Sequence, residues 1–78
     1  MQPTLATQPL PDLCQYPHAT GVLRDALRRH RTPEQRRALA ASYREDARKM
    51  RAAEDLAAYA PAYDAIAAHI DAAAEDAR

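Results

Sequence analysis

Apolar positions in the last third of the chain recur at helical spacing. Between Leu56 and the end of the chain, the steps alternate between three and four residues through Leu56, Tyr59, Tyr63, Ile66, Ile70, Ala73 and Ala77. Such steps place side chains on one face of an α-helix, and their alternation makes a heptad seam. The pattern predicts a helix over residues 62–77 that packs against another helix.

A second apolar stripe precedes this one and predicts a long helix. Its members follow one another at steps of three or four residues: Leu39, Tyr43, Ala47, Met50, Ala53 and Ala57. Thr32 is a good N-cap, Pro33 suits the first helical position, and Gln35 can complete a capping box with Thr32. We therefore expect a helix that begins at Pro33 and runs to about Tyr59.

Pro61 lies between the two stripes, and its effect can be interpreted in two ways. A proline inside a helix removes one hydrogen bond and clashes with the preceding turn, so it either breaks or kinks the helix. If Pro61 breaks the helix, residues 62–77 fold back to form a helical hairpin. If it only kinks the helix, a single helix of about 45 residues results, and such a helix needs a second chain beside it.

A shorter helix and an arm precede the long helix. Val22, Leu23, Ala26, Leu27 and His30 share one helical face, which predicts a helix over about residues 20–30 with Thr20 as its N-cap. Residues 1–19 contain four of the six prolines, so we expect an extended proline-rich arm there and a helical domain over 20–78. Four apolar residues are spaced along the arm: Leu5, Leu10, Leu13 and Tyr16. They predict that it lies in a groove, either on the chain's own helices or on a partner.

The composition supports a helical fold with a small core. Of 78 residues, 20 are alanine, which is the best helix former, and ten are Leu, Ile or Val, with no Phe or Trp. Small domains bury a low fraction of their surface. We expect an all-α fold of two or three helices, either a helical hairpin or a small bundle with a proline-rich N-terminal arm. Because the large apolar side chains are few, we also expect a homodimer or other homo-oligomer.

Charge is segregated along the chain, although the net charge is zero. Residues 24–51 hold ten basic and four acidic side chains, whereas residues 52–77 hold six acidic and no basic ones. One interpretation is that the basic half pairs with the acidic half across an antiparallel hairpin or dimer. The other is that the basic face binds nucleic-acid phosphates. The residues that would make such contacts are Arg24, Arg28, Arg29, Arg31, Arg36 and Arg37.

One local resemblance favours the nucleic-acid interpretation. Residues 32–39, which read TPEQRRAL, resemble the start of the DNA-binding region of sigma-type helix-turn-helix proteins. That family would place a recognition helix after a short turn, but residues 43–50 contain no turn residue. We therefore interpret the segment as helix capping.

The sequence offers no arrangement typical of an enzyme or a cofactor site. Ser42 is the only serine and Gly21 the only glycine, so neither a serine triad nor a phosphate-binding loop is indicated. His18, His30, His69 and Cys14 lack the close paired spacing of zinc ligands. We expect no enzyme, no cofactor and no metal. The single cysteine suits the reducing cytoplasm, and no stretch is long and apolar enough to suggest a membrane-spanning helix.

These observations predict a small regulatory protein that binds and modulates a larger protein, in the manner of an inhibitor, antitoxin or adaptor. The alternative is a small DNA- or RNA-binding regulator that uses the basic face of residues 24–51. Tyrosine and large aliphatic side chains are typical of interface hot spots and cores alike. The residues that we predict at the partner interface are Leu10, Leu13, Tyr16, Tyr59, Tyr63, Ile66 and Ile70.

Overall fold

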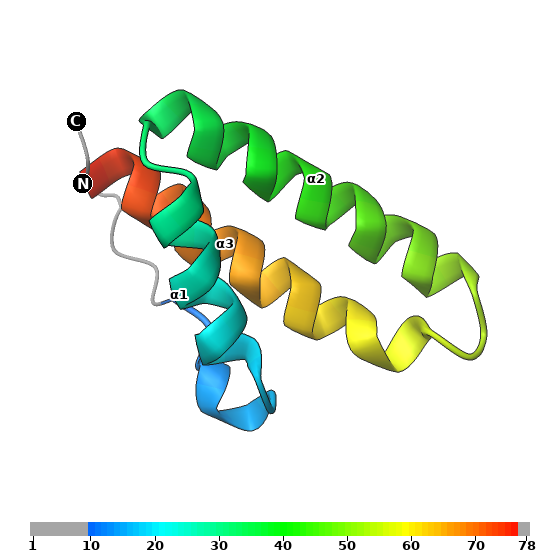
Figure 1. The fold of residues 1–78 in the computed structure, drawn as a ribbon. Coiled ribbons are helices and arrows are strands. Elements are labelled where there is room, and N and C mark those ends of the chain that lie inside the picture. Colours follow the sequence, from blue (N-terminus) through cyan, green and yellow to red (C-terminus); the bar gives the residue numbers. More distant parts are fainter. Residues whose placement is uncertain (1–9, 77–78) are drawn as a thin grey trace, which may run out of the picture.

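A computed structural model of the protein describes residues 10–76. Over this range the chain forms three α-helices and two short 3-10 helices, and no strand (Figure 1). The elements are η2 (Leu13–Gln15), α1 (Ala19–Arg29), α2 (Pro33–Ala52), η3 (Ala57–Tyr59) and α3 (Ala60–Asp76). The predicted all-α fold is therefore confirmed.

Helices α2 and α3 form an antiparallel hairpin, so the hairpin alternative is confirmed (Figure 1). The chain leaves α2 before it reaches Pro61, however, so the expected break at this proline is wrong. Pro61 is the second residue of α3, where its missing N–H has no intrahelical partner to lose. The expectation that α2 continues to about Tyr59 is wrong, because the helix ends at Ala52. From there the chain turns through successive backbone hydrogen bonds, with Leu56 N donating to Ala53 O at 3.0 Å and Tyr59 N donating to Leu56 O at 2.9 Å. Packing α3 against α2 outweighs the helix propensity of this alanine-rich stretch.

Buried alanines bring the two long helices together. Ala40 and Ala47 in α2, and Ala60 and Ala67 in α3, have no exposed surface. Ala74 follows Ala67 at the same seven-residue interval and is only 1% exposed. We call these five residues the alanine seam. A side chain of a single methyl group lets two helix backbones approach closely, so the hairpin is stabilised by close packing rather than by large apolar side chains.

The predicted heptad seam agrees with the structure only in part. Ile66 and Ile70 are buried at 4% and 0% exposure. Leu56 and Tyr59 instead precede α3 and are 42% and 60% exposed, and Ala77 lies outside the described residues. The seam prediction gave weight to the larger residues and left out the buried alanines Ala60, Ala67 and Ala74.

Two ion pairs cross the hairpin on one side. Arg44 Nη1 lies 2.7 Å from an Asp71 carboxylate oxygen, and Arg51 Nη1 lies 2.6 Å from one of Asp64. Both pairs are partly exposed, so each contributes at most about 1 kcal/mol to stability. They nevertheless join the basic and acidic halves of the chain, which supports the hairpin interpretation of the charge segregation.

Helix α1 reaches α2 through a tightly capped corner. Thr32 Oγ1 accepts a hydrogen bond from Gln35 N at 3.1 Å, and Gln35 Oε1 accepts one from Thr32 N at 3.2 Å. This is the predicted capping box, which is thus confirmed. The prediction of Thr20 as the cap of α1 is wrong. The N-cap is His18, which has a left-handed φ of 71° and makes no capping hydrogen bond through its side chain.

The described part of the arm lies against the chain's own helices. Leu13 in η2 is 8% exposed and belongs to the same apolar cluster as Ala26 and Ile70. His69 Nε2 in α3 donates to Pro11 O at 2.7 Å and so joins the arm to the hairpin. Leu5 lies outside the described residues.

We predict that Thr32→Ala lowers the free energy of unfolding by about 1 kcal/mol, because the backbone N–H of Gln35 loses its acceptor, Thr32 Oγ1. Thr20→Ala is the matched control, since Thr20 is exposed within the first turn of α1 and is not its cap. Urea denaturation of the two variants measures both values. An equal effect of the two substitutions would contradict the assignment of the cap.

We also predict that Ala67→Leu destabilises the protein by about 1–3 kcal/mol, because the added atoms must fit between two helices in contact. Ala41→Leu adds the same atoms to an exposed position of α2 and should change stability little. The denaturation midpoints of the two variants provide the comparison. A neutral Ala67→Leu would show that the helices are not closely packed at the alanine seam.

Candidate functional site

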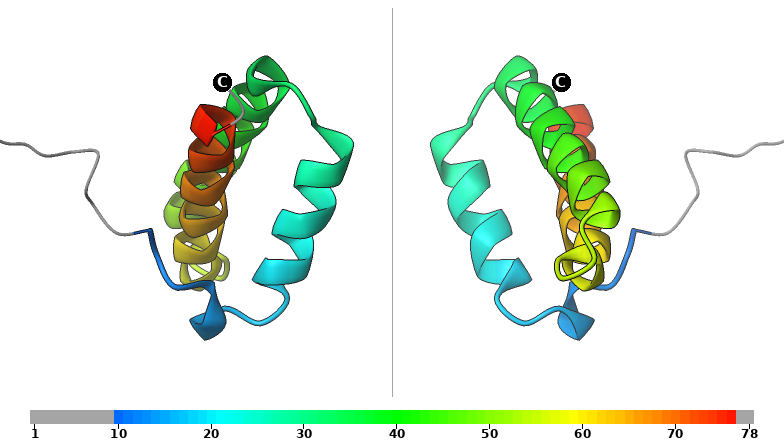
Figure 2. Two further views of the ribbon diagram at one scale, coloured as in Figure 1. Left: turned by 90° about the vertical axis from the view of Figure 1, so that its left-hand side faces the viewer. Right: turned by 90° about the vertical axis from the view of Figure 1, so that its right-hand side faces the viewer.

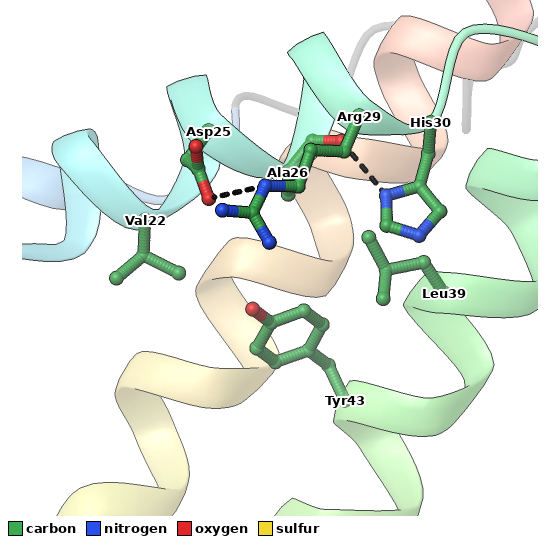
Figure 3. Close-up of a pocket in the computed structure, with 7 residues that line it drawn as sticks. All are labelled: Val22, Asp25, Ala26, Arg29, His30, Leu39 and Tyr43. Carbon is green, nitrogen blue, oxygen red and sulfur yellow. Dashed lines mark hydrogen bonds and ion pairs between the residues drawn. The ribbon is translucent and has the colours of Figure 1, made fainter.

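A cleft of about 210 Å³ lies between α1 and α2. Seven residues line it, five from α1 and its C-cap and two from α2: Val22, Asp25, Ala26, Arg29, His30, Leu39 and Tyr43 (Figure 3). Val22 and Tyr43 project into the space from opposite walls, while Asp25 and Arg29 lie along the α1 wall (Figure 3). We call this space the α1–α2 cleft.

The cleft exists because α1 packs on α3 more than on α2. Viewed from the side, α2 and α3 lie together and α1 stands apart on one face of the pair (Figure 2). Helix α1 has 11 residues and α2 has 20. At a rise of 1.5 Å per residue, these helices are about 16 Å and about 30 Å long. Helix α1 crosses the hairpin near the end away from η3, so the end near η3 is uncovered on this face (Figure 1).

The walls of the cleft carry apolar surface that the fold leaves partly open. Val22 is 40% exposed, which makes it one of the more exposed large apolar residues of the described chain. Leu39 and Tyr43 are half-buried and pack against the core cluster below. The ring of Tyr43 also contacts that of Tyr63 in α3, with ring centroids 5.4 Å apart and planes tilted by 56°. This tilted arrangement is favourable for aromatic pairs and holds the wall in place.

The environment of Tyr43 shows that the cleft is partly shielded from water. Partial burial raises the pKa of the Tyr43 phenol above its ordinary value, and the nearby Tyr63, Asp25 and Asp46 raise it further. Each of these influences disfavours the negatively charged phenolate. Tyr43 therefore offers a neutral hydroxyl to the cleft at physiological pH, able to donate or accept one hydrogen bond.

The α1 wall carries a small cluster of charges. Asp25 forms ion pairs with two arginines, with Arg28 Nη2 at 3.1 Å and Arg29 Nε at 3.2 Å from its carboxylate oxygens. Both arginine side chains are largely exposed and that of Asp25 is partly exposed, so the contacts are weak. An acidic group on a docking molecule can therefore compete for Arg28 or Arg29 at little cost.

The six arginines that we predicted to face nucleic acid do not form one free surface. Arg36 is half-buried and donates to three backbone carbonyl oxygens, those of His30 at 2.7 Å, Leu27 at 3.1 Å and Ala73 at 3.4 Å. Arg31 Nε donates to Arg28 O at 3.2 Å. Arg24 and Arg37 make no hydrogen bond or ion pair with another residue of the described range.

The predicted partner-interface residues fall into three groups. Leu13, Ile66 and Ile70 face the chain's own core. Tyr16 and Tyr63 are half-buried. Only Leu10 and Tyr59 are well exposed, at 47% and 60%.

Sequence reasoning missed the α1–α2 cleft, although some of its residues were on predicted apolar faces. Val22 is on the face that predicted a helix over residues 20–30, and Leu39 is in the stripe that predicted the long helix. The helical period places each residue on the inner face of its helix, but it does not show how far apart the two faces lie. That separation depends on how α1 crosses α3, which no local pattern encodes.

The histidines and the cysteine do not come together as a metal site. Within residues 10–76, no group of three or more His, Cys, Asp or Glu side chains is placed to hold a metal ion. His30 Nδ1 instead contacts Ala26 O at 3.0 Å at the end of α1, and His69 binds the arm. In the same range, no helix combines the length and apolar character that crossing a bilayer requires.

Comparisons with protein-family models, with curated protein sequences and with solved structures gave no match to this chain.

We predict that Tyr43 ionises at a higher pH than an ordinary tyrosine. Its raised pKa means that the folded state disfavours the phenolate more than the unfolded state does. The resulting stabilisation is complete below the ordinary tyrosine pKa and is lost as the pH rises through the folded value. An ultraviolet titration of tyrosinate should show a component above the ordinary tyrosine pKa that is lost in Tyr43→Phe and kept in Tyr59→Phe. Loss of that component in Tyr59→Phe would contradict the assignment.

Proposed function

We propose that this protein is a small helical regulator that binds a larger protein through the α1–α2 cleft, as an inhibitor, antitoxin or adaptor does. The observation that carries the proposal is the partly open apolar wall formed by Val22, Leu39 and Tyr43. A small domain with few large apolar residues gains stability by burying them, so leaving Val22 at 40% exposure favours a partner that covers it.

The chemistry of the cleft indicates what the partner presents. A space of about 210 Å³ accommodates one bulky apolar side chain, and the phenol of Tyr43 offers a hydrogen bond at its edge. Arg29 lies along the same wall and Arg28 is next to it in α1, and both are held only by weak, exposed contacts to Asp25. The partner segment that fits is therefore short and helical or turn-like, with a large apolar side chain and an adjacent carboxylate.

The placement of the arginines favours a protein partner over nucleic acid. Arg36 donates hydrogen bonds to three backbone carbonyl groups, and Arg28 and Arg29 both form ion pairs with Asp25. Helix α2 runs without a turn from Pro33 to Ala52, so residues 32–39 are not followed by a separate recognition helix. The single cysteine of the chain, Cys14, is exposed and unpaired, and we infer a reducing compartment such as the cytoplasm.

A pair of matched substitutions tests the proposal. Val22→Glu places a charge in the cleft, whereas Leu10→Glu places the same charge at a similarly exposed residue on the arm. The full-length protein should capture a protein from its host in stoichiometric amounts. The purified partner should bind Val22→Glu at least tenfold more weakly, which corresponds to about 1.4 kcal/mol, and bind Leu10→Glu as it binds the unaltered chain.

Equal binding of the partner to both variants would show that the cleft is not the docking site. If no protein is captured and the chain instead shifts the mobility of DNA or RNA in a salt-dependent manner, the nucleic-acid alternative is correct. In that case Arg24→Ala combined with Arg37→Ala should weaken the shift, because these two arginines are not engaged within the described chain.

A further inference from the structure

We propose that a second copy of this chain occupies the α1–α2 cleft, with the hairpin tip of each copy docked in the cleft of the other. The hairpin tip is the stretch 53–59 that joins α2 to α3. The inference rests on the cleft being a docking site, as proposed above. It adds that the chain itself carries the segment that fits, so that self-association and partner binding compete for one surface.

The hairpin tip has the apolar side chains that the cleft requires. Leu56 is 42% exposed and Tyr59 is 60% exposed, and together with Leu10 and Val22 they are the exposed large apolar residues of the described chain. Leu56 is the N-cap of η3 and Tyr59 is its last residue, so the two lie three residues apart in one tight turn. Of these four residues, two lie in the tip, and Val22 lies in the cleft.

The tip and the cleft also match in charge. Glu54 and Asp55 precede Leu56 directly, and the tip contains no basic residue. Neither carboxylate forms an ion pair within residues 10–76. By contrast, α1, which forms one wall of the cleft, carries Arg24, Arg28 and Arg29 and a single acidic residue, Asp25. Of these four, Arg29 and Asp25 line the cleft itself. The cross-helix ion pairs of the hairpin involve Arg44 and Arg51, so they leave this complementarity unused.

The position of α1 leaves the tip free to dock. Helix α1 crosses the hairpin near the end away from η3, so the tip end is uncovered on this face (Figure 1). If each tip docks in the cleft of the other copy, the result is a closed two-fold dimer in which the same pair of surfaces meets twice.

Sedimentation equilibrium of the full-length chain is the first test. We expect a dimer at micromolar concentration. Leu56→Glu and Tyr59→Glu should each raise the dissociation constant at least tenfold, and Leu10→Glu, at 47% exposure, is the matched control that should not. Because these residues are exposed, circular dichroism should show unchanged helix content in all three. A chain that stays monomeric at hundreds of micromolar, or a Leu56→Glu variant that associates normally, would overturn the proposal.

A mixing experiment tests that the tip meets the cleft rather than another tip. Val22→Glu damages only the cleft and Leu56→Glu only the tip, so each variant alone should be monomeric. A mixture of the two keeps one undamaged tip and one undamaged cleft in each heterodimer. The mixture should therefore associate more strongly than either variant alone. If mixing gives no gain, the tip does not dock in the cleft.

Charge reversal at the tip gives an independent readout. Glu54→Lys combined with Asp55→Lys should weaken the dimer at low salt and much less at high salt, because exposed charges are screened. Equal association of this variant and the unaltered chain at low salt would exclude the charge match.

The partner found by capture separates this inference from the proposed function. Leu56→Glu leaves the cleft intact, so it should bind that partner at least as tightly as the unaltered chain does. If dimerisation is absent while Val22→Glu still loses the partner, the proposed function holds and this inference fails. If dimerisation follows the pattern above while the partner binds Val22→Glu as tightly as the unaltered chain, the second copy occupies the cleft and the larger partner docks elsewhere.

Discussion

The close approach of α2 and α3 at the alanine seam is the constraint on which the rest of the structure depends. Alanine offers little apolar area, so its contribution comes from contact between backbones rather than from bulky side chains. Such contact requires a strict register, and the two ion pairs at Arg44 and Arg51 lie in that same register along one edge. The relative position of α2 and α3 is thus set by the buried alanines between them and by the two ion pairs along one edge.

A hairpin built in this way has little apolar surface left with which to hold a third helix. Helix α1 contributes Leu23, Ala26 and Leu27 to the core cluster, and the arm adds Leu13. The corner between α1 and α2 compensates through polar contacts. Arg36 binds carbonyl groups at the end of α1 and near the end of α3, so one side chain joins all three helices. With α1 held by its C-terminal end and resting on α3, its other wall stays apart from α2, and the cleft results.

Much of the fold was predictable because its signals are local. The capping box at Thr32 uses residues three apart, and a proline at the start of a helix has a known positional preference, so both appear in the sequence itself. The end of α2 at Ala52 was not predictable in this way. Residues 53–60 are good helix formers, and only the gain from packing α3 makes the chain turn there. Thr20 failed as a cap for a similar reason, because η2 and Tyr16 set where α1 begins.

The candidate site was less predictable than the fold, and Ile70 and Val22 show why. Both are large apolar residues on a helical stripe, yet Ile70 is fully buried and Val22 is 40% exposed. The difference arises from tertiary geometry, since α3 is contacted by every other helix whereas α1 is contacted on one side. The core of this alanine-rich bundle buries some of its few large apolar residues and leaves others exposed. Those that the core does not bury are left at the open ends, where another molecule can reach them. The apolar surface that such a protein offers to another molecule therefore lies at the places where its own helices do not cover one another.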